Sequence, residues 1–423
     1  MIDSASSLPD ARPGLIVPAR RFYYGWVIVA VAALAMVGTL PGRTQGLGLI
    51  TEPLITDLAI DRIEYAQINL IATLVGSLFA FGVGSVIDRR GSRVVVTVIA
   101  VLLGLVVIAM SRSTTVMALL VFVTLTRGLG QTALSIVSLA MVGKWFRRRL
   151  TWAMGVYALV MSIGFMLAFP AVGALVLASG WRTAWAAVGV SLLAAIAPVS
   201  WIFTRSTPES AGREMDGDAT ATRIHDASED ATLGGALASP AFWIFAVASS
   251  LYGLVASGIG LFNESVLAER GFAPEVYHSA LAVTAMTGLA GNFAAGAWAE
   301  RGSLRSVLVT AMAVLGAALA ALPHVSTTLH VMLQAVAMGI AGGFVMVVFF
   351  SFWGRTYGQT HLGRIQGAAQ VMTVIASAVG PLILAWCVES TGSYAVAFYT
   401  LAATVVVLGL SALVVRIPGE RPV

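Results

Sequence analysis

Long apolar stretches alternate with short polar ones along almost the whole 423-residue chain. A helix needs about 20 apolar residues to cross a hydrocarbon core of roughly 30 Å, and these stretches approach or exceed that length. The pattern predicts an all-α membrane protein with twelve transmembrane helices, at residues 23–49, 66–87, 93–111, 114–143, 151–178, 183–204, 239–262, 276–299, 304–323, 328–352, 364–387 and 393–416.

One long polar segment interrupts this rhythm after the sixth span. Residues 205–235 read "RSTPESAGREMDGDATATRIHDASEDATLGG", with almost nothing to bury, which is typical of a solvated linker. Six predicted helices therefore lie on either side of it. The domain organisation that we predict is a cytoplasmic tail at 1–22, a six-helix bundle at 23–204, a cytoplasmic linker at 205–237, a second bundle at 238–416 and a cytoplasmic tail at 417–423.

The two predicted bundles repeat one another in sequence. "GLGLITE" at 46–52 returns as "GIGLFNE" at 258–264, an offset of 212 residues. The same offset pairs further residues of the two halves: Tyr65 with Tyr277, Gly76 with Gly288, Phe81 with Phe293, Gly84 with Gly296, Asp88 with Glu300, Arg89 with Arg301, Arg93 with Arg305, Gly155 with Gly367 and Gly180 with Gly392. The halves are thus predicted to be pseudo-symmetric copies of one unit.

Composition and charge support the membrane assignment and orient the chain. Hydrophobic residues make up 58% of it and charged residues 11%, against roughly half and one quarter in soluble domains. Most of the 25 Lys and Arg fall at one end of the predicted helices, so the positive-inside rule places both termini in the cytoplasm. The net charge of +5 then reflects topology and attraction to anionic lipid, not nucleic-acid binding.

The segment "GSVIDRRGSR" at 84–93 matches the Gly-x-x-x-Asp-Arg-x-Gly-x-Arg signature between the second and third helices of major facilitator superfamily transporters. A weaker copy, "GAWAERGSLR", occupies the equivalent place in the second half. Further stretches resemble the monocarboxylate-transporter-like and oxalate/formate-antiporter-like branch: "RFYYGW", "LPGR", "GKWFRRR", "GWRTAW" and "GRIQG". The resemblance implies a carrier whose substrate site lies between the two halves near the membrane midplane.

The resemblance also implies a gate at the cytoplasmic side, formed by Asp88, Arg89, Arg93, Glu300, Arg301 and Arg305. Glu300 departs from the usual acid, and the glycine of the second copy is displaced to Gly302. The alternative is that these charges serve topology alone. Three groups near the opposite membrane face are candidates for proton linkage, with interfacial roles as the alternative: Glu52, Glu264 and His278.

Two arginines lie inside predicted spans. Arg127 is 13 residues into the fourth span, about 20 Å at 1.5 Å per residue, and Arg43 is deep in the first. A guanidinium in hydrocarbon is costly without a partner, yet no Asp or Glu falls clearly at mid-span. The missing partner is predicted to be an anionic substrate, although Arg127 could instead be a strut bonded to carbonyls and Gln131.

Other polar residues are candidate substrate contacts or simple packing residues: Gln131, Tyr157, Tyr252, Gln370 and Thr373. Arg43 stands near Pro41, about where monocarboxylate transporters of this resemblance carry a lysine, and a helix irregularity that lines the substrate cavity is expected at Pro41. Two departures weaken an assignment to oxalate. The eighth span, 276–299, lacks the charged residues typical of that branch, and the eleventh has Gln370 where a basic residue is common.

The favoured function is a secondary active carrier of small organic anions, with monocarboxylates as first candidates, working by symport or antiport in the plasma or inner membrane. Alternatives are a carrier or efflux pump for neutral or cationic compounds, and a sensor or scaffold without turnover. No phosphate-binding Walker loop and no metal-ligand spacing occurs, so no enzyme activity, cofactor or metal is predicted. The oligomeric state stays open, and a monomer is compatible with the sequence.

Overall fold

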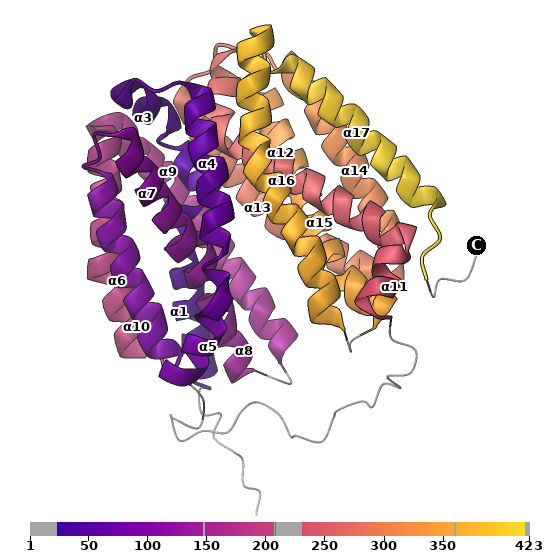
Figure 1. The fold of residues 1–423 in the computed structure, drawn as a ribbon, viewed down its shortest axis with the longest axis horizontal. Coiled ribbons are helices and arrows are strands. Elements are labelled where there is room, and N and C mark those ends of the chain that lie inside the picture. Colours follow the sequence, from indigo (N-terminus) through magenta and orange to yellow (C-terminus); the bar gives the residue numbers. More distant parts are fainter. Residues whose placement is uncertain (1–22, 147–148, 207, 209–230, 359–360, 419–423) are drawn as a thin grey trace, which may run out of the picture.

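The computed structural model describes residues 23–146, 149–206, 208, 231–358 and 361–418, and helices account for nearly all of these residues (Figure 1). The predicted tail at 1–22 and most of the predicted linker lie outside the described residues. The described ranges contain no β-strand element.

The first half is built from helices that are interrupted at several points. Its elements are α1 (Gly25–Val37), η1 (Leu40–Gly42), α2 (Thr44–Gly48), α3 (Thr51–Leu58), α4 (Arg62–Ser77), α5 (Ala80–Arg90), α6 (Ser92–Met110), α7 (Val116–Thr126), η2 (Arg127–Leu134), α8 (Ser135–Trp145), α9 (Leu150–Ser191), η3 (Leu192–Ile196) and α10 (Ala197–Phe203).

The second half is more regular. Its elements are α11 (Leu233–Ala238), α12 (Pro240–Ala268), α13 (Pro274–Arg301), α14 (Leu304–Ala321), η6 (Leu322–His324), α15 (Thr328–Tyr357), α16 (Leu362–Thr391) and α17 (Ala395–Val414). The short helix α11 begins inside the segment that the sequence analysis assigns to the linker.

Ten helices in the described part are long and apolar enough to cross a membrane. One of these runs from Trp152 to Phe203, and its backbone breaks at Gly180, where φ is 78° and ψ is 158°. The first predicted span is divided among α1, η1 and α2. Twelve segments would result from dividing the long helix at Gly180 and counting the interrupted first span as one, so the count of twelve stays a prediction.

The sequence repeat is also a structural repeat. Thr115 and Thr327, related by the offset of 212, cap α7 and α15 by accepting hydrogen bonds from Ala118 N and His330 N. Gly180 and Gly392 both have positive φ, a conformation that glycine adopts without strain. The same local signals thus begin and end the helices of both halves.

The two halves stand side by side, with α3 at one end of the molecule and α5, α8, α10 and α11 toward the other (Figure 1). They meet closely at the α3 end. A Cβ added to Gly48 would lie 2.1 Å from the carbonyl oxygen of Gly260, its own repeat partner. At the α11 end, a Cβ on Gly84, Gly296 or Gly367 would meet nothing within 4 Å. The backbones of the two halves thus approach each other closely at the α3 end, whereas these three glycines near the other end face open space.

Candidate functional site

The first predicted span is interrupted at a proline. Pro41 has no backbone N–H to donate, and the chain forms the short turn η1 before Arg43 takes an extended conformation with φ −87° and ψ 150°. Helix α2 then begins at Thr44. The irregularity predicted at Pro41 is present, and it fixes where the Arg43 side chain leaves the backbone.

Arg43 is half-buried and held by neutral groups. Its Nε donates to Thr39 Oγ1 at 2.6 Å, and its Nη2 lies 2.8 Å from Met36 Sδ. The guanidinium carbon lies 5.2 Å from the ring centroid of Phe165, which places a cation over an aromatic face. These contacts orient the group without neutralising its charge.

Arg127 is almost completely buried, with 2% of its surface exposed, and it also contacts only neutral acceptors. Its Nη1 donates to Gly42 O at 3.2 Å, to Thr44 Oγ1 at 2.8 Å and to Gln131 Oε1 at 2.6 Å. Its Nη2 donates to Asn69 Oδ1 at 2.8 Å. Arg127 thus forms hydrogen bonds to the residues on both sides of Arg43. These bonds connect the fourth predicted span to the first and the second.

The helix around Arg127 is widened. Residues Arg127–Leu134 form a π-helix, a feature often found at functional positions. A Cβ on Gly42 would lie 2.2 Å from Thr126 O and 3.1 Å from Gly130 Cα, so the break in the first span packs directly against this turn. Glycine is needed there because the two backbones approach so closely.

Neither arginine contacts a carboxylate among the described residues. Both arginines donate their hydrogen bonds to hydroxyl, amide, carbonyl or thioether groups. The ion pairs found in the described part of the chain involve other residues. The two guanidinium groups are close enough to interact electrostatically. The result is a patch of uncompensated positive charge inside the bundle.

Tyr157 completes the first-half cluster. Its hydroxyl lies 2.9 Å from Ser138 Oγ, and Ser138 in turn donates to Ala32 O at 2.6 Å. The Tyr157 hydroxyl therefore donates to Ser138, and it lies near the Arg43 guanidinium. Arg43, Arg127, Gln131 and Tyr157 are brought together as one group.

The candidates of the second half lie on helices α12 and α16. Tyr252 on α12 is half-buried, and a Cβ on Gly342 would lie 2.0 Å from its hydroxyl oxygen, so Gly342 makes room for the ring. Thr373 Oγ1 on α16 lies 3.3 Å from Ser250 Oγ and donates to Ala369 O. Gln370 is exposed.

Glu52 and Glu264 lie at the α3 end, where they line one cavity of about 440 Å³ together with Arg62 and Tyr394. Glu52 forms an ion pair with Arg62 at 2.7 Å. The repeat thus brings its two glutamates to the same place from opposite halves.

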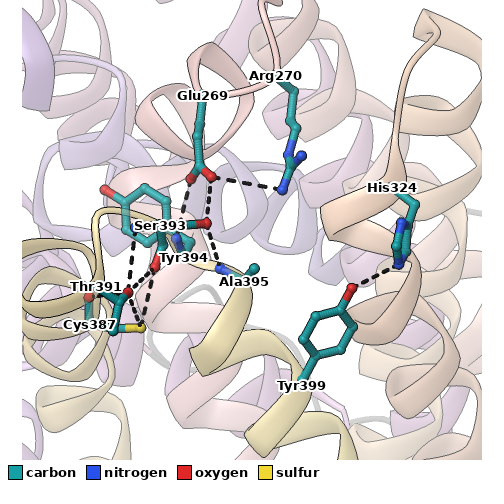
Figure 2. Close-up of polar contacts among 9 residues, drawn as sticks. All are labelled: Glu269, Arg270, His324, Cys387, Thr391, Ser393, Tyr394, Ala395 and Tyr399. Carbon is teal, nitrogen blue, oxygen red and sulfur yellow. Dashed lines mark hydrogen bonds and ion pairs between the residues drawn. The ribbon is translucent and has the colours of Figure 1, made fainter.

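A polar network joins α12 to the α16–α17 turn beside this cavity (Figure 2). Glu269 accepts hydrogen bonds from Ser393 Oγ at 2.6 Å and from Tyr394 N at 3.2 Å, and the Tyr394 hydroxyl lies 2.9 Å from Ser265 Oγ. Burial raises the pKa of the Tyr394 hydroxyl, so it stays neutral and available to Ser265. The network links the end of α12 to the start of α17 in one wall of the cavity.

His278 lies at the contact between the halves. It is 5% exposed, its Nε2 has no hydrogen-bond partner among the described residues, and a Cβ on Gly173 would lie 2.4 Å from its Nδ1. The neighbouring Tyr277 reaches across to Gln45 O at 3.4 Å and to Gly260 O at 3.3 Å. His278 therefore packs against Gly173 of the other half, and no hydrogen bond joins it to Arg43 or Arg127 among the described residues.

The signature arginines bind within their own halves. Arg93 Nε donates to Trp201 O at 2.7 Å, and its guanidinium carbon lies 4.3 Å from the Trp201 ring centroid. Arg305 donates to Leu413 O at 3.1 Å and to Val415 O at 2.8 Å. Trp201 and Leu413 are themselves related by the offset of 212. Arg89, Glu300 and Arg301 are exposed, and the Asp88 side chain lies outside the described residues.

Sequence reasoning missed several partners of the two arginines. Asn69 in the second span and Thr39, Thr44 and Phe165 are all direct contacts. The contact of Asn69 could have been anticipated from the sequence, since an amide side chain inside an apolar span needs a hydrogen-bond partner. No group of three or more metal-ligating side chains occurs within the described ranges.

The chain belongs to the major facilitator superfamily, whose family model matches residues 23–263 and 245–423. A comparison with curated proteins finds no match. Among solved structures, the nucleoside transporter NupG matches with a TM-score of 0.72 and 13% identity, over 91% of this chain and 98% of that one.

A second match is a bacterial homologue of the human lysosomal transporter Spinster in an inward-facing and occupied conformation. Its TM-score is 0.70 at 14% identity, over 92% of this chain and 95% of the other. At such identities the likeness concerns the fold. The family and the fold together define a multi-pass membrane transporter that takes a small-molecule substrate.

Proposed function

We propose that this chain is a secondary active carrier of small organic anions, with monocarboxylates as the first substrates to test. The observation that carries the proposal is the pair of interior arginines, Arg43 and Arg127, which contact only neutral groups among the described residues. Charge in a membrane interior normally has a counter-charge. A bound carboxylate supplies it here.

The two arginines have different roles in this proposal. Four acceptors surround Arg127, whereas Arg43 has one hydroxyl, one thioether and an aromatic face, and it is more exposed. Arg43 is the group that binds the substrate carboxylate, through charge-assisted hydrogen bonds. Arg127 is a positioning residue, because it holds Gly42 and Thr44 on either side of Arg43.

In our proposal the remaining candidate residues shape the substrate site at Arg43 and form hydrogen bonds with the substrate. Tyr157 and Gln131 face the substrate from the first half, and Tyr252, Thr373 and Gln370 face it from the second. A small carboxylate bridged between the halves would lower the cost of closing the cavity around Arg43, which couples substrate binding to rocking of the halves.

We further propose that the chain crosses the membrane twelve times with both termini in the cytoplasm. The membrane is the plasma membrane or the inner membrane of the cell. In that orientation the α3 end faces outward, and the tight contact of Gly48 with Gly260 closes the outer side. The arrangement is then inward-facing. Asp88, Arg89, Arg93, Glu300, Arg301 and Arg305 would latch the cytoplasmic side in the opposite state, and Glu52, Glu264 or His278 would carry a coupled proton.

The test is uptake by purified protein in liposomes. Labelled lactate, pyruvate, formate, oxalate and uridine are offered with an imposed inward proton gradient, and again with internal unlabelled substrate. We expect saturable uptake of at least one monocarboxylate and none of uridine. Uptake of uridine without any anion would overturn the proposal.

A neutral substrate is the second candidate. The uncharged polar group around Tyr252, Ser250 and Thr373 suits hydroxyl groups, and NupG is described as a nucleoside transporter. In that case both arginines would be structural. Uridine in the same panel distinguishes the two candidates.

A further inference from the structure

The second predicted span is bent where its repeat partner is straight. Phe81 and Gly82 have non-helical backbone angles, with φ 93° at Gly82, so α5 leaves the direction of α4. The equivalent residues Phe293 and Ala294 lie within the unbroken helix α13. Gly82 permits the bend because side chains other than glycine are strained at that φ.

A lateral cavity of about 700 Å³ opens behind the bend, between α5, α6 and η2. Its walls are apolar and include Phe79, Val83, Val94, Val98 and Leu129. Phe81 at its edge is 82% exposed. An apolar volume of this size is ample for a ligand chain and would be unfavourable in water.

One end of the cavity is positively charged. Arg89 and Arg90 line it, both are exposed, and neither has a hydrogen bond or an ion pair with a described residue. Arg93 is already engaged with Trp201. The segment "DRRGSR" carries three arginines and one acid, so its net charge is positive.

The groove combines an apolar wall with a charged end. Phe81 and Val83 precede Arg89 and Arg90 along α5, so apolar side chains and two guanidinium groups follow one another along one element. Acyl chain and headgroup follow one another in the same way in a phospholipid. Anionic headgroups attract such paired cations near the membrane surface.

We propose that this groove, with Phe79, Phe81, Val83, Val94, Val98 and Leu129 in its wall and Arg89 and Arg90 at its charged end, is a binding site for one anionic phospholipid. The acyl chains fill the apolar part, and the phosphate bonds the two guanidinium groups. The second half lacks the site, because α13 is straight and Gly302 stands at the position equivalent to Arg90.

The test is native mass spectrometry of the delipidated full-length protein in detergent, titrated with phosphatidylglycerol and with phosphatidylcholine of the same acyl chains. We expect tighter binding of phosphatidylglycerol to the wild type. Arg89→Gln combined with Arg90→Gln is expected to weaken that binding by roughly tenfold or more and to remove the preference. The matched control Arg301→Gln changes the repeat-related residue and is expected to keep it.

Two further arms separate the lipid from a simple phosphate site and from misfolding. Soluble glycerol phosphate is not expected to displace phosphatidylglycerol, because it cannot fill the groove. Gly82→Ala is expected to reduce binding of both lipids. Equal binding of the two lipids to the wild type, an equal loss in Arg301→Gln, or displacement by glycerol phosphate would each overturn the proposal. The wild-type comparison needs no variant to fold.

Discussion

Position 127 in the first half and position 339 in the second are related by the repeat, and they hold an arginine and a glycine. Around Arg127 the helix widens into η2, and four polar acceptors surround the side chain. Around Gly339 helix α15 is unbroken, and its backbone nearly touches α13, since a Cβ would lie 2.6 Å from Thr284 O.

The same contrast extends to the partners of Arg127. Asn69, Gln131 and Thr44 correspond to Leu281, Gly343 and Ala256, and Arg43 itself corresponds to Val255. One copy of the unit uses these positions for polar contacts, and the other uses them for close packing of helices. One shared fold therefore carries buried polar contacts in one half and close helix packing in the other.

The largest expected effect comes from Arg127→Gln. The change leaves Asn69, Thr44 and Gly42 O without their donor, and we expect a loss of about 2–3 kcal/mol in stability together with a loss of transport. Thermal unfolding in detergent measures the former. The exposed Arg112→Gln is the control, and a midpoint equal to that control would contradict the strut role.

The converse change tests the packed half. A Cβ at Gly339 would lie 2.1 Å from Thr287 Oγ1, so Gly339→Ala is expected to cost about 1–3 kcal/mol through overpacking. Gly367→Ala, where a Cβ meets nothing within 4 Å, is the matched control. If the two variants unfold at the same temperature, close packing at Gly339 is not what stabilises the second half.

A smaller effect is expected where the halves touch each other. Gly48→Ala places a Cβ against Gly260 O, which penalises the conformation closed at the α3 end. Each 1.4 kcal/mol of penalty shifts the population about tenfold toward the other conformation.

Electron–electron distance measurements report this shift. The spin labels are attached at the exposed positions Thr56 and Glu275, which lie in different halves at the α3 end. The native Cys387 is replaced by Ala so that only these two positions are labelled. We expect a longer distance to gain population in Gly48→Ala but not in Gly84→Ala. Unchanged distances in both would argue against a gate at Gly48.

The smallest effect concerns the paired acids. Glu52 has Arg62 as its partner, whereas Glu264 shares the cavity with Glu52. Removing the charge at Glu264 by Gln is expected to flatten the pH dependence of uptake by a few-fold, and Glu275→Gln, exposed at the same end, is the comparison. An unaltered pH profile would remove Glu264 from the candidates for proton linkage.

Much of the fold was predictable because it depends on local signals. The lengths of the apolar stretches located the spans, and the sequence repeat located equivalent helix ends. For example, α7 through α8 covers Val116–Trp145, and α15 covers Thr328–Tyr357 at the offset of 212. The bend at Gly82 and the widened turn at Arg127 were not predictable, because hydrophobic pattern does not encode backbone angles within a span.

The site was predictable in part. The buried arginines stood out because charge is rare inside a membrane span, and the irregularity at Pro41 followed from the missing N–H. The pairing of Arg127 with Asn69 and Thr44 could not be derived, since it joins residues far apart in sequence. Only the packed structure shows that the Nη atoms of Arg127 have four acceptors while Arg43 is more available.

The most direct test of the account is uptake of labelled pyruvate into liposomes by the wild type, Arg43→Gln and the surface control Arg112→Gln. Arg43→Gln is expected to fold normally and to lower kcat/KM by about a hundredfold, because a buried charge pair is broken, and the control is expected to transport like the wild type. Full transport by a folded Arg43→Gln protein would contradict the central claim that Arg43 binds an anion.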